Sequence, residues 1–135
     1  MTKREIFASG TRWEPIVGYS RAVKVGDQVW ISGTTATGAD GRLVGGDDPY
    51  AQTRQILANI ERALVRAGAE LADVVRTRIY VTDISQWEAI ARAHGEVFGD
   101  IRPATAMIEV RRLIEAAMLV EIEADAVITD RAAGR

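Results

Sequence analysis

Hydrophobic and polar residues alternate along several stretches of the chain, which is the pattern of half-buried β-strands. The alternating stretches are residues 19–25, 28–35, 71–83, 104–112 and 118–128, with a weaker one at 4–9. Gly26 and Asp27 separate the first two stretches and are typical of a tight hairpin turn. The pattern therefore predicts a sheet of five strands, or six if the N-terminal stretch joins it.

Two further stretches place apolar residues at helical spacing. Residues 49–67 carry Ile56, Leu57, Ile60, Leu64 and Ala67 on one face, and residues 87–98 carry Trp87, Ile90, Ala91, His94 and Phe98. Asp48 suits the N-cap of the first helix, Pro49 its first position and Gly68 its end. Residues 85–88 have the spacing of a capping box for the second helix, and Gly99 suits its end.

Side chains alternate between the two faces of a strand, so the strands predict which face is covered. The expected apolar face carries Val120, Ile122, Ala124, Ala126 and Ile128, then Ala104, Ala106, Ile108 and Val110, and one row of the middle strand, Val75, Thr77, Ile79 and Val81. The expected opposite face carries Glu121, Glu123 and Asp125, then Thr105, Met107, Glu109 and Arg111, and the other row, Val74, Arg76, Arg78 and Tyr80. Because the helices lie between strands in the sequence, we expect an α+β fold with both helices on the apolar face.

The second face of this sheet is mixed, because Met107 and Leu119 stand among its polar residues. Solvent exposure explains the polar residues there. A subunit interface with polar pockets explains both the polar and the apolar residues. The pattern therefore favours an oligomer over a monomer.

Composition narrows the class of protein. The chain has 135 residues, which predicts one domain over 1–135. It has no cysteine, which excludes disulfides and thiolate catalysis, and we expect a cytoplasmic protein. The net charge of −2 argues against nucleic acid or an anionic membrane as a partner. No apolar run reaches the roughly 18 residues of a membrane helix, and the N-terminus has no hydrophobic leader.

Few residues suggest chemistry by themselves. The single histidine, His94, is best interpreted as a packed and hydrogen-bonded core residue, since no further ligands accompany it for a metal. The glycine-rich loop at 38–48 lacks the ending of a phosphate-binding loop and is interpreted as a flexible connection. Three carboxylates of the last strand, Glu121, Glu123 and Asp125, share one face, and a crowded carboxyl group can act as a general acid or base. A solvated edge or interfacial salt bridges to arginines explain this row, and acid–base catalysis is the alternative.

Several segments together resemble the Rid/YjgF family, also called the endoribonuclease L-PSP family. They are "GYSRAVKVGDQVWISGTTA" at 18–36, "VVRTRIYVTDISQWEAIARAHGEVFGDIRPATAMIEVRRL" at 74–113 and "MLVEIEADAVI" at 118–128. The resemblance covers about residues 17–128, and its most specific parts are the G-x-x-FGD-x-RPAT run and the VEIEADA ending. It implies a chorismate-mutase-like fold, a homotrimer, and a small-molecule ligand cleft between subunits. It also implies hydrolysis of reactive enamines and imines without cofactor or metal.

The resemblance also suggests site residues. Tyr19, Ser32 and Gly33 match residues that form the ligand cleft, and Glu121 matches the glutamate that positions the hydrolytic water. Thr105 stands where the family deaminases carry the arginine that binds the substrate carboxylate. A threonine cannot form a bidentate ion pair, so the chain is identified as a member of a subgroup without that arginine. Arg21, on the same face as Tyr19, is a candidate substitute.

Three functions remain open at this point. The first is hydrolysis of a small enamine, imine or related compound, with Glu121 as the catalytic residue. The second is a trimer that binds a small metabolite without chemistry, since the strong anion-binding residue is absent. The third and weakest is the ribonuclease or translation inhibitor of the older family names, because the chain has no basic stripe with interspersed aromatic residues.

Overall fold

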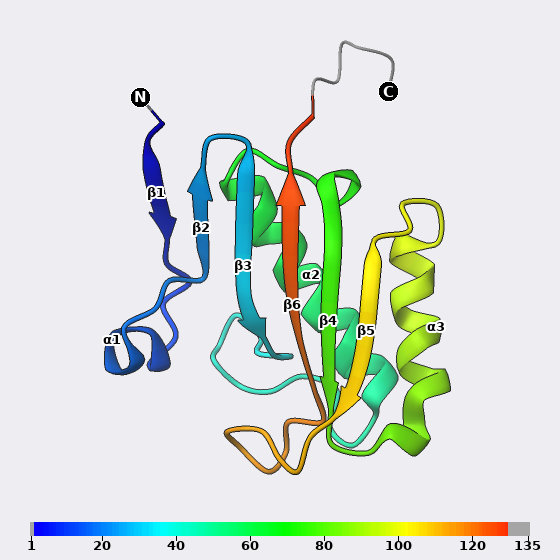
Figure 1. The fold of residues 1–135 in the computed structure, drawn as a ribbon. Coiled ribbons are helices and arrows are strands. Elements are labelled where there is room, and N and C mark those ends of the chain that lie inside the picture. The colour runs from blue at the N-terminus through cyan, green and yellow to red at the C-terminus, as the bar shows by residue number, and fades with distance from the viewer. Residues whose placement is uncertain (1, 130–135) are drawn as a thin grey trace.

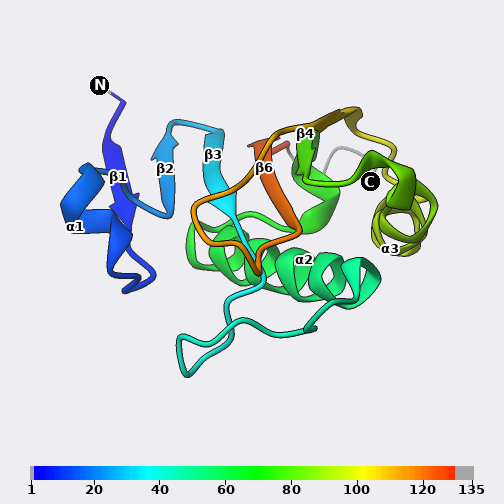
Figure 2. The ribbon, with the colours of Figure 1, turned by 90° about the horizontal axis from the view of Figure 1, so that it is seen from below.

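The computed structural model contains one six-stranded sheet with two helices on one face (Figures 1 and 2). It describes residues 2–129; Met1 and residues 130–135 of the predicted domain lie outside the described residues. The strands are β1 (Arg4–Phe7), β2 (Ala22–Val25), β3 (Gln28–Thr34), β4 (Val74–Val81), β5 (Ala104–Glu109) and β6 (Val120–Val127), in the spatial order β1-β2-β3-β6-β4-β5. All neighbours are antiparallel except β4 and β5, which are parallel.

Helices α2 (Pro49–Arg66) and α3 (Trp87–Phe98) cover the sheet, and a short α1 (Trp13–Val17) lies beyond β1. Two single 3-10 turns, η1 (Leu71–Asp73) and η2 (Ile84–Gln86), precede β4 and α3. The predicted α+β fold with two helices on one face is confirmed. Among the described residues, no helix combines the length and the apolar character needed to cross a membrane.

The predicted turn and the boundaries of the first long helix are confirmed. Gly26 has a positive φ of 60° in the two-residue turn between β2 and β3, a conformation that glycine adopts without steric cost. Asp48 Oδ1 accepts a hydrogen bond of 2.9 Å from the backbone N–H of Tyr50, so it is the N-cap of α2. Gly68, just beyond the C-terminus of α2, also has a positive φ.

The predicted capping box at 85–88 is wrong. Asp83, not Ser85, receives the hydrogen bonds: its Oδ1 accepts from the backbone N–H of Ser85 at 3.0 Å and from the Ser85 hydroxyl at 2.6 Å. Asp83 therefore caps the 3-10 turn η2, and α3 begins behind that turn at Trp87. The sequence spacing did not reveal the extra turn, because Asp and Ser are equally good caps.

Strand β6 lies in the middle of the sheet and follows its predicted alternation throughout. Val120, Ile122, Ala124 and Ala126 are buried, and the residues between them are half-buried. Ile56, Ile60 and Leu64 of α2 belong to the same buried core. Burying each such aliphatic side chain contributes about 1.5–3 kcal/mol relative to exposure. The packing of β6 against α2 therefore determines that the acidic residues of β6 lie on the opposite face of the sheet.

The predicted faces of β5 are reversed in the structure. Strands β4 and β5 pair in parallel with Thr77 opposite Thr105 and Arg78 opposite Ala106. Paired residues point to the same side, and the hydroxyls of Thr77 and Thr105 are 2.8 Å apart. Thr105 therefore lies on the helix-covered side, and Ala106 lies on the open side. β5 is an edge strand with little burial, so hydrophobicity did not determine its register.

The predicted assignment of β4 residues to the two faces of the sheet is correct only from Arg76 onward. Val74 is buried and Val75 is 47% exposed, the opposite of their predicted positions. The register of β4 against β6 shifts between Val74 and Arg76, which marks a β-bulge. A bulge inserts one residue and reverses the alternation before it.

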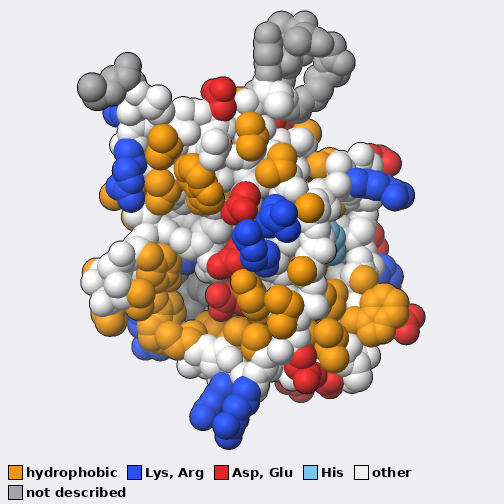
Figure 3. Space-filling view, in the orientation of Figure 1, with side chains coloured by type: hydrophobic (Ala, Val, Ile, Leu, Met, Phe, Trp, Pro, Cys, Tyr) orange, Lys and Arg blue, Asp and Glu red, His pale blue; other side chains and the backbone are white. Residues whose placement is uncertain are grey.

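The open face of the sheet is charged at its centre and apolar around it (Figure 3). Arg78 of β4 forms a 3.2 Å ion pair with Asp125 and lies 3.9 Å from Glu123. Trp30 of β3 and Ile108 of β5 belong to the same face and are 41% and 47% exposed. Two large apolar side chains are therefore exposed on this face beside the charged centre.

Candidate functional site

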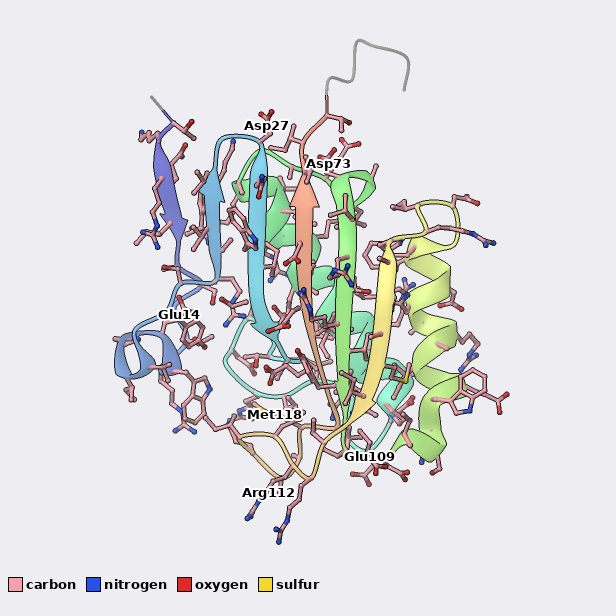
Figure 4. All side chains as sticks on the ribbon, in the orientation of Figure 1. Glu14, Asp27, Asp73, Glu109, Arg112 and Met118 are labelled. Atoms are coloured by element: carbon pink, nitrogen blue, oxygen red, sulfur yellow. The ribbon has the colours of Figure 1, made fainter. Side chains whose placement is uncertain are left out.

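A cavity of about 550 Å³ lies at the end of β3 and brings together five of the six predicted site residues. They are Tyr19, Arg21, Ser32, Gly33 and Glu121. Its walls come from α1, the end of β3, the last turns of α2 and the loop before β6. Met118, which lies on that loop between α1 and β5 in Figure 4, is part of the lining.

The Glu121 carboxyl group lines this cavity without a hydrogen-bond partner among the described residues. No hydrogen bond or ion pair reaches its carboxyl group from any residue within 2–129. Burial raises the pKa of Glu121, the neighbouring Glu123 raises it further, and Arg21 partly offsets both. A half-buried carboxyl group with a raised pKa and free lone pairs is suited to accept a proton from water.

The close approach of Glu121 to the backbone depends on a glycine. A Cβ on Gly33 would overlap the Glu121 carboxylate oxygen and lie 3.0 Å from its Cδ. The register of β3 against β6 shifts between Ile31 and Thr34, so two residues of β3 oppose one residue of β6 there. This bulge gives Gly33 its position under the carboxylate.

Arg21 lies at the cavity, but most of its donors are used by the protein. Its side chain is only 8% exposed. Nη1 donates to the carbonyl of Gly33 at 2.6 Å and to the hydroxyl of Thr34 at 3.2 Å, and Nε donates to the Ser9 hydroxyl at 3.3 Å. Nη2 donates to the Tyr19 hydroxyl at 3.3 Å. These bonds indicate that Arg21 mainly orders the wall of the cavity.

Ser32 is also committed to the fold. Its hydroxyl donates to the Ser20 carbonyl at 2.6 Å, and its backbone N–H donates to the Arg21 carbonyl at 3.0 Å. Only the lone pairs of the Ser32 oxygen remain for a ligand. Tyr19 also lines the cavity, and its ring centroid lies 5.5 Å from the Arg21 guanidinium.

Thr105 does not belong to this cavity within one chain. It is exposed on the edge strand β5, on the opposite side of the sheet from Glu121, so the prediction that both share a face is wrong. Its hydroxyl donates to the Pro103 carbonyl at 3.1 Å and contacts Thr77. Its predicted role in ligand binding remains a prediction.

His94 is a packed, hydrogen-bonded histidine, as predicted. Its Nε2 lies 2.9 Å from the Thr77 hydroxyl, and its ring centroid is 4.7 Å from that of Phe98. Burial lowers its pKa. Within residues 2–129, no group of three or more His, Asp or Glu side chains is arranged to hold a metal ion.

Sequence reasoning missed Glu14, a second buried glutamate beside the cavity. Burial alone would raise its pKa, but hydrogen bonds from the hydroxyls and backbone N–H groups of Ser9 and Thr11 lower it to about 2. The sequence Thr11-x-x-Glu14 has capping-box spacing and contained the signal for α1. Glu14, labelled in Figure 4, therefore stays ionised and holds the connection between β1 and α1 in place. Glu121 has no such bonds and remains available to bind a ligand or water.

The mouth of the cavity is apolar. Trp13 and Val17 of α1 and Ile114 of the loop before β6 line it, and Val17 and Ile114 are largely exposed. Arg12 stacks over the Trp13 ring at 4.2 Å and pairs with Glu115 at 3.5 Å, so an exposed ion pair connects α1 to the loop. Arg112 of the same loop points away from the body of the protein (Figure 4).

Two further basic residues of the cavity were missed. Arg62 and Arg66 of α2 are exposed and line the cavity four residues apart on one helix face. Neither they nor Arg21 has a carboxylate within 4.0 Å among the described residues. Glu123, the other acid of the cavity, accepts a 2.8 Å hydrogen bond from Tyr80 OH, and this bond raises the pKa of Tyr80.

Comparison with known proteins identifies the family. The model of the endoribonuclease L-PSP family matches residues 9–128. A RutC family protein of Pyrococcus abyssi is 35% identical over 125 residues, which is 92% of this chain and 96% of that protein.

Two solved structures share the fold closely. The crystal structure of Rv2704 from Mycobacterium tuberculosis, a member of the YjgF/YER057c/UK114 family, has a TM-score of 0.85 and 53% identity, covering 93% of this chain and all of that one. YyfA of Yersinia pestis, from the conserved Rid protein family, has a TM-score of 0.83 and 31% identity, with 93% and 100% coverage. The chain therefore belongs to the endoribonuclease L-PSP family, the family also known as YjgF or Rid.

Proposed function

We propose that the protein hydrolyses a small enamine or imine, with Glu121 as the catalytic residue. The observation that carries this proposal is the Glu121 carboxyl group: it lies in a cavity with a raised pKa and has no partner among the described residues. Such a group is suited to hold one water molecule and to take its proton. The family relationship supports the same chemistry.

The proposed reaction needs only water. An enamine that takes up a proton at carbon becomes the iminium ion. Glu121 accepts a proton from water while the water oxygen bonds to the carbon of the C=N group, and the nitrogen takes up the π electrons to give a neutral amino alcohol. The protonated Glu121 gives that proton to the amino nitrogen and takes the proton of the new hydroxyl as the carbonyl forms, the C–N bond breaks and ammonia departs; Glu121 then releases this proton to solvent.

The proposed assembly is a homotrimer formed through the open sheet face. The exposed Trp30 and Ile108 beside the Arg78–Asp125 pair support this interface. Thr105 lies on the helix-covered side of the edge strand β5, opposite to this interface, so its proposed role in ligand binding requires a neighbouring subunit to reach it at the sheet edge. Light scattering of the purified protein tests the assembly, and a monomer at micromolar concentration would contradict it.

The direct test is ammonia release. Wild-type protein, Glu121→Gln and the surface control Glu61→Gln are incubated with 2-iminopropanoate, generated in the assay, and with a panel of larger imines. We expect release by the wild type and the control and a loss of at least about a hundredfold in Glu121→Gln. No release above background from any imine would refute the proposal.

Metabolite binding without chemistry is the second candidate, because Thr105 cannot form a bidentate ion pair with a carboxylate. Thermal stabilisation by a metabolite that is recovered unchanged would favour it. Cleavage of RNA that survives purification and disappears in Glu121→Gln would instead favour the nuclease implied by the family description.

A further inference from the structure

The α2 side of the cavity is basic and exposed, and its β6 side is acidic. Arg62 and Arg66 line the cavity from α2, whereas Glu121 and Glu123 line it from β6. Helix α2 covers the face of the sheet opposite to the face that carries Glu121 (Figure 2). The cavity therefore extends around the end of β3 and joins two differently charged regions.

The two α2 arginines are placed close together without a compensating acid. Residues four apart on a helix are neighbours, and like charges at this spacing destabilise the helix. The helix dipole favours a cation in the last turn, which explains Arg66 but not Arg62, one turn earlier. Among the described residues, no carboxylate lies within 4.0 Å of either guanidinium.

The described partners of both guanidinium groups are neutral and leave most of their donors unused. Arg62 Nη1 donates to Asn59 Oδ1 at 3.3 Å. Arg66 Nη1 donates to the Ala8 carbonyl, and its guanidinium lies 5.9 Å from the Phe7 ring centroid. Each guanidinium has five N–H donors, so several on each residue remain for a ligand.

Asn59 holds this region in place. Its Nδ2 donates to the carbonyls of Thr35 at 3.1 Å and Thr37 at 2.9 Å. Its Oδ1 accepts from Gln55 Nε2 at 2.9 Å and from Arg62 Nη1 at 3.3 Å. The loop after β3 and helix α2 are therefore connected at the point where the cavity ends. A guanidinium positioned by a fixed amide loses less conformational entropy when it binds an anion.

We infer that Arg62 and Arg66 form an anion-binding subsite for a carboxylate of the ligand. The inference rests on the proposed function and deepens it: the substrate would carry its carboxylate several bonds away from the C=N carbon. The carboxylate lies at the α2 arginines, the reacting carbon lies at Glu121, and an apolar spacer connects them. This substrate class differs from 2-imino acids, whose carboxylate adjoins the C=N carbon.

Keto acids of increasing spacer length test the subsite, since they resemble the hydrolysis products. Isothermal titration calorimetry compares pyruvate, 4-oxopentanoate and 6-oxoheptanoate, with 2-heptanone as the uncharged analogue of the longest. We expect affinity to increase with spacer length and 2-heptanone to bind at least about tenfold more weakly than 6-oxoheptanoate, as for loss of a charge-assisted hydrogen bond.

Arginine variants identify the residues responsible. Arg62→Gln and Arg66→Gln should each lose about tenfold in affinity for 6-oxoheptanoate and remain unchanged toward 2-heptanone. Arg54→Gln is the matched control, because Arg54 lies on the same helix but pairs with Glu96 outside the cavity. Equal binding of 6-oxoheptanoate by the wild type and Arg62→Gln would overturn the inference. Tighter, Arg62-dependent binding of inorganic phosphate would overturn the assignment to a carboxylate.

Binding and turnover separate this inference from the proposed function. Arg62-dependent binding without ammonia release from any imine would refute hydrolysis and leave the subsite supported. Ammonia release from long-chain imines that is unchanged in Arg62→Gln would support hydrolysis and refute the subsite.

Discussion

The Glu121 carboxyl group lies directly over Gly33, in space that a Cβ on residue 33 would occupy. Gly33→Ala should therefore move the carboxyl group without unfolding the protein, because the end of a flexible side chain can shift. We expect ammonia release to fall at least about tenfold, and the free energy of unfolding to change by less than about 1 kcal/mol.

Gly95→Ala is the matched control for this substitution. Gly95 lies inside α3, and a Cβ there meets no atom within 4 Å. Replacing a helical glycine with alanine stabilises by about 0.5–1 kcal/mol and should leave activity unchanged. Full activity in Gly33→Ala would show that the position of Glu121 is not critical.

The pH dependence of activity should report the ionisation of Glu121. Burial and the neighbouring Glu123 raise its pKa, so the proton-accepting carboxylate is lost as the pH falls through a value above 4.5. Glu123→Gln removes a neighbouring negative charge and should move this acidic limb to lower pH. The pH profile of kcat between pH 4 and 8 measures the shift, with Glu61→Gln as the control. An acidic limb that stays in place would exclude Glu121 as its origin.

Sequence patterns predicted the fold well where burial is strong. Strand β6 is central and packs against α2, so its alternation identified both the core and the acidic row that contains Glu121. Strand β5 is an edge strand whose two faces are similar in polarity, and its prediction was reversed. The parallel pairing with β4 determines its faces, and that pairing is not visible in β5 alone.

The candidate site was only partly predictable for a different reason. Tyr19, Ser32, Gly33 and Glu121 were identified through motifs shared with the family. Arg62 and Arg66 belong to a helix whose outward positions are generally charged, so their pattern is indistinguishable from a solvated surface. Only the tertiary arrangement of α2 beside the end of β3 brings them into the cavity.

Glu14 should contribute to stability in a pH-dependent way. Its pKa of about 2 in the folded protein lies below the ordinary value of 4.5, so its contribution is present above pH 4.5 and is lost as the pH falls toward 2. Glu14→Gln should lower the free energy of unfolding at pH 7 by about 1–3 kcal/mol. Urea unfolding at pH 7, 4 and 3 measures the difference, which should shrink toward low pH. A difference that is constant with pH, or equally large for the exposed Glu61→Gln, would contradict this assignment.

Thr77 should be more important for stability than its hydrogen-bonded neighbour Thr105. The Thr77 hydroxyl is buried and lies 2.9 Å from His94 Nε2 and 2.8 Å from the Thr105 hydroxyl. Thr77→Val keeps the shape but leaves the half-buried imidazole nitrogen without a partner, at a cost of about 1–3 kcal/mol. Thr105→Val removes only an exposed hydroxyl and should cost less than about 1 kcal/mol. Urea unfolding at pH 7 measures the free energy of unfolding of both variants. Equal losses of stability in the two variants would mean that the hydroxyl of Thr77 contributes nothing beyond its packing.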